Sequence, residues 1–201
     1  MTTNKKFLLL IIFFPISFLV LFNLIGGYFF HDTLDFFRMY KYVYIISEND
    51  DYPLFTSKLD QGISISNFYW WIGSLGISVI KLSQFLNINS FYSYNIYIII
   101  VLIIFLYGVF LNLKNSKNGL LKFILFCSFF FGATLFYRQL AWDLIMYLVI
   151  PYVMYWSLKF ANTGNFKNIN KIFLSLISNF FLFSSYILIY TSYISLIIII
   201  I

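Results

Sequence analysis

The sequence predicts an all-α protein whose helices cross a membrane several times. Three features predict this class: an apolar composition, several long apolar stretches, and a separation of acidic from basic residues along the chain. Of the 201 residues, 62% are hydrophobic and only 10% are charged, whereas a soluble domain carries about 25% charged residues. A soluble protein must cover itself with polar groups, and this chain has too few of them to do so.

Apolar stretches long enough to cross a bilayer, which takes roughly 20 residues, recur along the chain. They cover residues 7–30, 91–113, 120–136, 142–160 and 172–190 or beyond, and Pro151 lies inside the fourth. The first stretch is too long for a signal peptide and no small-residue cleavage site follows it, so we expect a retained helix. The last one runs apolar to Ile201. We therefore expect residues 1–201 to be one membrane domain and the N-terminal part of a longer protein.

The distribution of charge predicts the orientation of these helices. Lysines precede the first expected span and occupy the connections between the second and third and between the fourth and fifth. Such loops face the cytoplasm, so we expect a cytoplasmic N-terminus and a long extracytoplasmic loop at residues 31–90. Six of the seven acidic residues lie within residues 31–60 of that loop. Because Ile, Phe, Asn, Lys and Tyr dominate, as in AT-rich bacterial genomes, we expect the bacterial cytoplasmic membrane.

Residues 64–86 are long enough to cross, but crossing would place the next lysine cluster outside. Asn67, Ser74, Ser78 and Lys81 recur at helical spacing on one face, and apolar residues occupy the other. This pattern predicts an amphipathic helix lying in the membrane interface.

The candidate site begins where the first expected span leaves the membrane, in the acidic stretch of residues 31–38. Asp32 and Asp35 are three residues apart, so on a helix they share a face, where a carboxylate can act as a general base or hold a divalent metal ion. His31 and Arg38 flank them. The alternative is that Asp32 caps a helix and Asp35 favours its first turn.

The second outer turn supplies the other candidates, Arg138 and Asp143. Arg138 is a natural partner for a phosphate at the membrane surface; alternatively it is a helix-end arginine paired with Asp143. A single cysteine, Cys127, excludes an intrachain disulfide and a paired-cysteine metal site. The scattered basic residues do not indicate nucleic-acid binding, although the net charge is +6.

The order of these elements resembles that of the bacterial C-type (GT-C) glycosyltransferase superfamily, and within it the YfhO-like membrane proteins. The matching pieces are residues 31–35, 52–55, 60–62 and the aromatic amphipathic stretch 68–86. The resemblance implies transfer of a sugar from a polyprenyl-phosphate donor to a cell-envelope glycan or lipid acceptor outside. It implies Asp32 or Asp35 as the base and Arg138 as a contact of the donor phosphate.

Two other classes remain open on the sequence. One is a polysaccharide polymerase or flippase-type envelope protein, in which arginines of the outer loops would dominate. The other is a non-enzymatic membrane subunit. A transporter is disfavoured because the expected spans are almost free of charge at their centres.

Overall fold

The computed structural model of the chain describes residues 3–24, 34–49, 66–137 and 148–182, and within these ranges the regular structure is entirely helical. The prediction of an all-α protein is thereby confirmed for this part of the chain. The helices are α1 (Thr3–Leu24), α2 (Leu34–Asn49), α3 (Ser66–Phe85), α4 (Ser90–Leu113), α5 (Gly119–Tyr137), α7 (Ile150–Thr163) and α8 (Lys167–Leu182).

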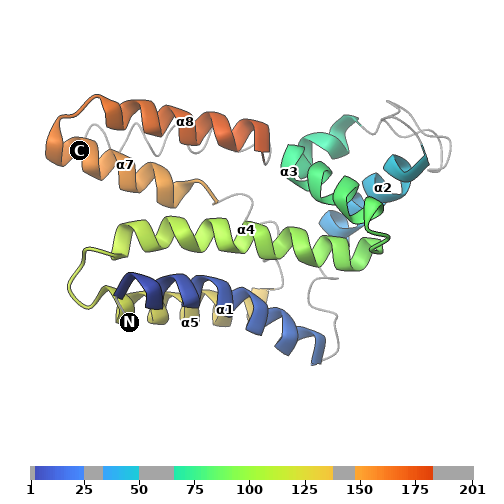
Figure 1. The fold of residues 1–201 in the computed structure, drawn as a ribbon, viewed down its shortest axis with the longest axis horizontal. Coiled ribbons are helices and arrows are strands. Elements are labelled where there is room, and N and C mark those ends of the chain that lie inside the picture. Colours follow the sequence, from blue (N-terminus) through green and yellow to red (C-terminus); the bar gives the residue numbers. More distant parts are fainter. Residues whose placement is uncertain (1–2, 25–33, 50–65, 138–147, 183–201) are drawn as a thin grey trace.

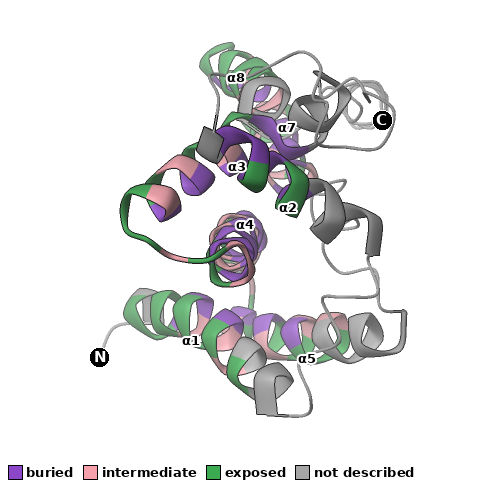
Figure 2. Ribbon diagram, turned by 90° about the vertical axis from the view of Figure 1, so that its right-hand side faces the viewer, coloured by how far each residue is buried: buried purple, intermediate pink, exposed green. Residues whose placement is uncertain are grey.

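Helix α4 lies at the centre, and α1, α2, α3, α5 and α7 all pack against it (Figures 1 and 2). The sequence of α4 is apolar on nearly every side, as expected of a helix surrounded by other helices. Val101, Leu102 and Leu106 near its middle are fully buried. Helix α8 packs mainly on α7, with a further contact to α3.

Helices α1, α4, α5, α7 and α8 run roughly along the long axis of the molecule, whose two ends differ chemically (Figure 1). The start of α1, the turn from α4 to α5 and the turn from α7 to α8 lie at one end, while α2, α3 and the turn from α3 to α4 lie at the other (Figure 1). We call the first the lysine end, because lysines lie on or beside each of its three segments: Lys5, Lys6, Lys114, Lys117, Lys122, Lys159, Lys167 and Lys171.

Gly108 allows α7 to approach α4 closely. A Cβ atom added to Gly108 would lie 2.7 Å from Cε2 of Tyr152 and 2.9 Å from Cβ of Pro151. The Tyr152 hydroxyl donates a hydrogen bond to the carbonyl of Ile104, and Nδ2 of Asn112 donates to the carbonyl of Pro151 at 2.7 Å. These bonds fix α7 along the second half of α4.

Among the described residues, α4 is the one helix long and apolar enough to cross a membrane, judged by length and composition. The helix expected at residues 91–113 is therefore confirmed. Helices α1, α5, α7 and α8 also overlap the other four expected spans. The crossing of a membrane by those four stays a prediction.

Helices α7 and α8 differ from the expected spans at their starts. The sequence predicted Pro151 inside the fourth span. Instead, α7 begins at Ile150 and Pro151 occupies its first turn. There the missing N–H of proline has no consequence, since first-turn N–H groups have no helical partner. Helix α8 begins at Lys167, earlier than expected, where Oδ1 of Asn165 accepts the Lys167 N–H at 3.0 Å.

The amphipathic helix expected over residues 64–86 is present as α3, but it is broken at Gly73. Gly73 has φ 68° and ψ 172°, a backbone conformation that glycine adopts readily and other residues do not. Carbonyls before such a break lack their helical partners, and the Tyr97 hydroxyl of α4 donates to the carbonyl of Ile72 at 3.3 Å.

The polar face expected on this helix is only partly exposed. Ser74 and Ser78 are exposed, but Lys81 is half-buried, and its Nζ donates to the carbonyl of Ser47 on α2 at 2.9 Å. Val79 is buried as expected, whereas Leu82 is 59% exposed. Helix α3 packs on both α2 and α4, and its placement along a membrane interface stays a prediction.

Large apolar side chains cover much of the outer surface of the helices. Phe13 on α1 is 64% exposed, Phe129 on α5 is 77% exposed, and Phe173 and Leu174 on α8 are each 63% exposed. Single exposed apolar residues are ordinary, but a surface dominated by them indicates contact with a partner or with lipid.

Buried tyrosines hold α2 and α3 against the first half of α4. The hydroxyls of Tyr40 on α2 and Ser93 on α4 are 2.8 Å apart and hydrogen-bonded. The Tyr44 hydroxyl donates to the carbonyl of Ile88, and Nε2 of Gln84 on α3 donates to the carbonyl of Tyr44 at 2.8 Å. Buried polar groups are nearly always hydrogen-bonded, and these bonds define how the three helices meet.

We expect Tyr40→Phe to lower the free energy of unfolding by about 0.5–1.5 kcal/mol, because it removes one buried hydrogen bond and leaves Ser93 without it. Denaturant titration of the solubilised protein measures this, with Tyr92→Phe as control because Tyr92 is 58% exposed. The Tyr40→Phe, Ser93→Ala double variant should lose less stability than the sum of the single variants. If the double variant loses as much stability as the two single variants together, the two hydroxyls do not interact.

Alkaline pH tests the same contact. Burial raises the pKa of Tyr40 above its ordinary value of 10, with the hydrogen bond from Ser93 opposing the rise. Above about pH 10 the unfolded chain therefore releases a proton that the native state retains, and stability falls as pH rises. The difference in stability between the native protein and Tyr40→Phe should narrow over that range.

Candidate functional site

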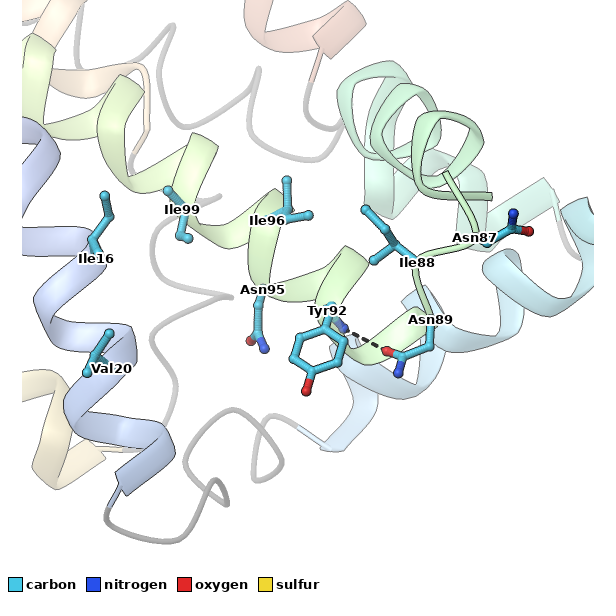
Figure 3. A pocket seen from close by; sticks show the side chains of 9 residues that line it. All are labelled: Ile16, Val20, Asn87, Ile88, Asn89, Tyr92, Asn95, Ile96 and Ile99. Atoms are coloured by element: carbon cyan, nitrogen blue, oxygen red, sulfur yellow. Dashed lines mark hydrogen bonds between the residues drawn. The ribbon is translucent and has the colours of Figure 1, made fainter. Parts of the chain in front are cut away.

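A groove of about 650 Å³ lies between α1 and the first half of α4. Its volume is within the range of small-molecule sites, about 300–1,000 Å³. Two residues of α1, the turn from α3 to α4, and one side of α4 form its lining (Figure 3). The lining residues are Ile16, Val20, Asn87, Ile88, Asn89, Tyr92, Asn95, Ile96 and Ile99.

The turn that forms one wall of the groove is fixed by its backbone. Asn87 has a positive φ of 54°, which asparagine tolerates better than most residues. The Ile88 N–H donates to the carbonyl of Ser83 at 2.8 Å, and the Asn87 N–H donates to that of Gln84 at 3.0 Å. This pair of bonds is the Schellman motif, which ends a helix and reverses the chain.

Asn89 starts α4 and so fixes the polar side of the groove. Its Oδ1 accepts the backbone N–H of Tyr92 at 3.0 Å, which caps the helix. Asn89, Tyr92 and Asn95 follow at intervals of three residues, a spacing that places them on one side of a helix. Figure 3 shows the side chains of Tyr92 and Asn95 on that side, with Ile16 and Val20 across from them on α1.

Asn95 is the buried polar group of the groove. The residue is only 7% exposed, and its Oδ1 has no hydrogen-bond partner within the part of the chain that the structure describes. Buried amide oxygens are nearly always hydrogen-bonded, and leaving one unpaired costs about 1–3 kcal/mol. An unpaired acceptor beside a groove is therefore suited to a ligand that donates a hydrogen bond.

The groove has the chemistry of a site for an amphiphile. The isoleucines at positions 16, 96 and 99, together with Val20, give it an apolar wall, while Asn87, Asn89, Tyr92 and Asn95 offer neutral donors and acceptors. None of its lining residues is charged. Neutral amide and phenol groups match hydroxyl groups, and an apolar wall matches an aliphatic chain.

The residues that the sequence proposed as a site lie mostly outside the described ranges. This applies to His31, Asp32, Arg138 and Asp143, while Asp35 and Arg38 lie in α2 with side chains beyond the description. Whether the two acidic residues meet Arg138 stays a prediction. In the described residues, no group of three or more His, Cys, Asp or Glu side chains could hold a metal ion.

The residues that line the groove were not predicted from the sequence. From residue 91 onward the sequence predicts a plain apolar span, and the preceding turn carries no motif that indicates a site. The signal that could have found them is the interval of three between Asn89, Tyr92 and Asn95 at the start of an apolar helix. No pattern in the sequence could have predicted that α1 packs across from them.

Comparison of the chain with protein-family models, with curated proteins and with solved structures found no match.

We expect Asn95→Leu to leave the protein as stable as before or up to about 1 kcal/mol more stable, because an apolar group replaces an unpaired oxygen. It should weaken binding of an alkyl maltoside roughly three- to tenfold, the effect of one lost hydrogen bond. Thermal unfolding in alkyl maltoside and in an amine oxide of the same chain length measures both effects.

The matched control is Asn170→Leu, since Asn170 is exposed on α8 and does not line the groove. A marked loss of stability in Asn95→Leu would show instead that the amide is bonded within the protein, and the groove would lose its polar anchor.

Proposed function

We propose that the protein is a membrane glycosyltransferase of the GT-C type, which transfers a sugar from a polyprenyl-phosphate donor to an envelope glycan or lipid acceptor. The observation that carries the proposal is the groove between α1 and α4, because it joins an apolar wall to an uncharged polar end. A lipid-linked sugar has the same two parts, an aliphatic chain and a head rich in hydroxyl groups.

The position of the groove along the chain also supports this function. Val20 lies in its wall on α1, and the sequence reaches Asp32 and Asp35 shortly after α1. The turn from α3 to α4, which lines the groove, lies at the end of the molecule that carries α2 and α3, opposite the lysine end (Figure 1). A sugar held in the groove would therefore lie at the same end of the molecule as the last part of α1, which the acidic stretch follows in the sequence.

Membrane placement rests on the apolar outer surface of the helices and on the length and composition of α4. With the lysine end in the cytoplasm, the groove would open toward the outer leaflet. The protein would then be a multi-pass protein of the bacterial cytoplasmic membrane, with polyprenyl-linked sugar, glycan acceptor and lipid as its partners.

The proposed chemistry needs one base and a stabilised leaving group. Asp32 or Asp35 would take the proton of the acceptor hydroxyl as that oxygen attacks the anomeric carbon, and the lipid phosphate would leave with the electron pair of the broken bond. Arg138 would stabilise the phosphate charge. His31, Arg38 and Asp143 would complete the contacts with substrate, and the two aspartates would also suit a divalent metal ion.

Replacing both acidic residues tests the enzymatic proposal. We expect the Asp32→Asn, Asp35→Asn variant to transfer sugar about 10²–10⁴-fold more slowly, the usual contribution of a general base. The assay follows a labelled sugar from a panel of polyprenyl-phosphate donors in proteoliposomes. Asn retains much of the capping ability of Asp, so folding should be unchanged.

Asp50→Asn, Asp51→Asn is the matched control, because it removes two acids of the same expected loop at a turn-forming stretch. Transfer that continues at the native rate in the Asp32→Asn, Asp35→Asn variant would reject the acid pair as the base. A non-enzymatic subunit would transfer no sugar in any of these proteins.

Membrane orientation is tested by cysteine labelling in a Cys127→Ser background. We expect Ser57→Cys to react with a membrane-impermeant maleimide added outside intact cells. Lys117→Cys, at the lysine end, should react only after the membrane is opened. Labelling of Ser57→Cys only from the cytoplasm would reverse the proposed orientation.

A further inference from the structure

Three lysines, on α7, on α8 and just after α4, lie around two adjacent aromatic rings at the lysine end. Nζ of Lys171 on α8 lies 4.1 Å from the ring centroid of Trp156, and Nζ of Lys159 on α7 lies 5.4 Å from it. Nζ of Lys114, just after α4, lies 5.4 Å from the ring centroid of Tyr155. The two rings are in edge contact, with centroids 4.7 Å apart. We call these five residues the lysine–aromatic cluster.

Hydrogen bonds hold the backbone that carries this cluster. The turn from α7 to α8 places Gly164 at φ 61°, and its N–H donates to the carbonyl of Phe160 at 2.8 Å. The Thr163 hydroxyl donates to the carbonyl of Lys159 at 2.7 Å and accepts a bond from Nδ2 of Asn168 at 3.1 Å. The turn therefore fixes α7 against α8 independently of the lysine side chains.

The cluster has no acidic counterpart nearby in the sequence. Between residues 61 and 201 the sole Asp or Glu is Asp143, and none occurs in α4, α5, α7 or α8. Ring faces attract ammonium groups but carry no net charge, so three lysines in one place still repel each other. An anion from outside the chain would remove that repulsion.

The surroundings indicate which anion fits. Met154 and Leu158 on α7 are 43% and 47% exposed, and Phe166 in the adjoining turn is 76% exposed. Apolar side chains next to paired Trp and Tyr rings are typical of the level where lipid headgroups meet acyl chains. A free phosphate would use the lysines alone, whereas a phospholipid would use the lysines and the apolar surface beside them.

We propose that the lysine–aromatic cluster binds the headgroup phosphate of an anionic phospholipid in the cytoplasmic leaflet. The phosphate oxygens accept hydrogen bonds from Lys114, Lys159 and Lys171, and the acyl chains lie along the exposed apolar face of α7. The site lies at the opposite end of α4 from the groove. It depends on the proposed membrane placement, and it does not depend on sugar transfer.

Lipid titration of the purified protein in a neutral detergent tests the site, with thermal unfolding as the readout. Phosphatidylglycerol should stabilise the native protein more than phosphatidylcholine does. The Lys114→Gln, Lys159→Gln, Lys171→Gln variant should bind phosphatidylglycerol about tenfold or more weakly, because each lysine near an anionic lipid contributes several-fold to affinity. The same three lysines changed to arginine should retain binding, since the charge is kept.

The matched control is Lys5→Gln, Lys6→Gln, Lys117→Gln, which removes the same charge from the same end but from exposed residues outside the cluster. Its affinity should stay close to native. An equal loss in this control would show general attraction to a basic surface and would overturn the site. Equal stabilisation by inorganic phosphate would also overturn the assignment to a lipid.

Two further measurements distinguish weaker lipid binding from misfolding, and failure of the lipid site from failure of the enzymatic proposal. Far-ultraviolet circular dichroism reports whether the triple glutamine variant keeps its helices, and if it does not, Lys171→Gln alone must show the weaker binding. Lost lipid binding with sugar transfer intact would reject only the lipid site. Lost transfer in the aspartate variant with lipid binding intact would bear only on the enzymatic proposal.

Discussion

The packing of five helices around α4 is the constraint on which the rest of the structure depends. Helix α4 has polar residues in two separate places, and each place receives a different partner. In its first half, Ser93 and Tyr97 form hydrogen bonds with α2 and α3. In its second half, α7 packs closely over Gly108 and is bonded by Asn112. Apolar packing has no preferred direction, so these four positions fix where α2, α3 and α7 lie along α4.

This arrangement separates two chemistries along one helix. The groove beside the first half of α4 is lined by neutral amides, a phenol and aliphatic side chains, whereas the far end carries lysines next to aromatic rings. A bilayer of about 30 Å is crossed by about 20 residues of helix, and α4 has 24 residues. In the proposed membrane placement, one helix thus sets the separation between the groove and the lysine–aromatic cluster.

The sequence predicted the helices better than it predicted their contacts. The expected spans 91–113 and 120–136 agree with α4 and α5 to within a residue at each end, because long apolar stretches bounded by polar turns have few alternatives. The break at Gly73 and the start of α7 beside Pro151 were missed, since glycine and proline can also lie within helices whose neighbours compensate. Both features depend on a partner helix, which periodicity does not reveal.

The candidate site was even less predictable. The residues predicted from the sequence lie at positions 31–38 and 138–143, because charged residues in an apolar chain often mark a functional site. The groove is made of uncharged residues, and Asn95 matters because it is buried beside the groove and no described residue bonds its oxygen. Such a residue is recognised by its burial, and burial is a property of the fold.

The bend of α3 at Gly73 has a consequence for the order in which the chain assembles. The carbonyl of Ile72 beside the break is bonded by the hydroxyl of Tyr97, a residue made only after α3 has been completed. The native bond at the break therefore forms only after Tyr97 has been synthesised. The hydrogen bond at the bend of α3 is thus completed by a residue of α4, and α3 alone does not contain all the contacts of its native form.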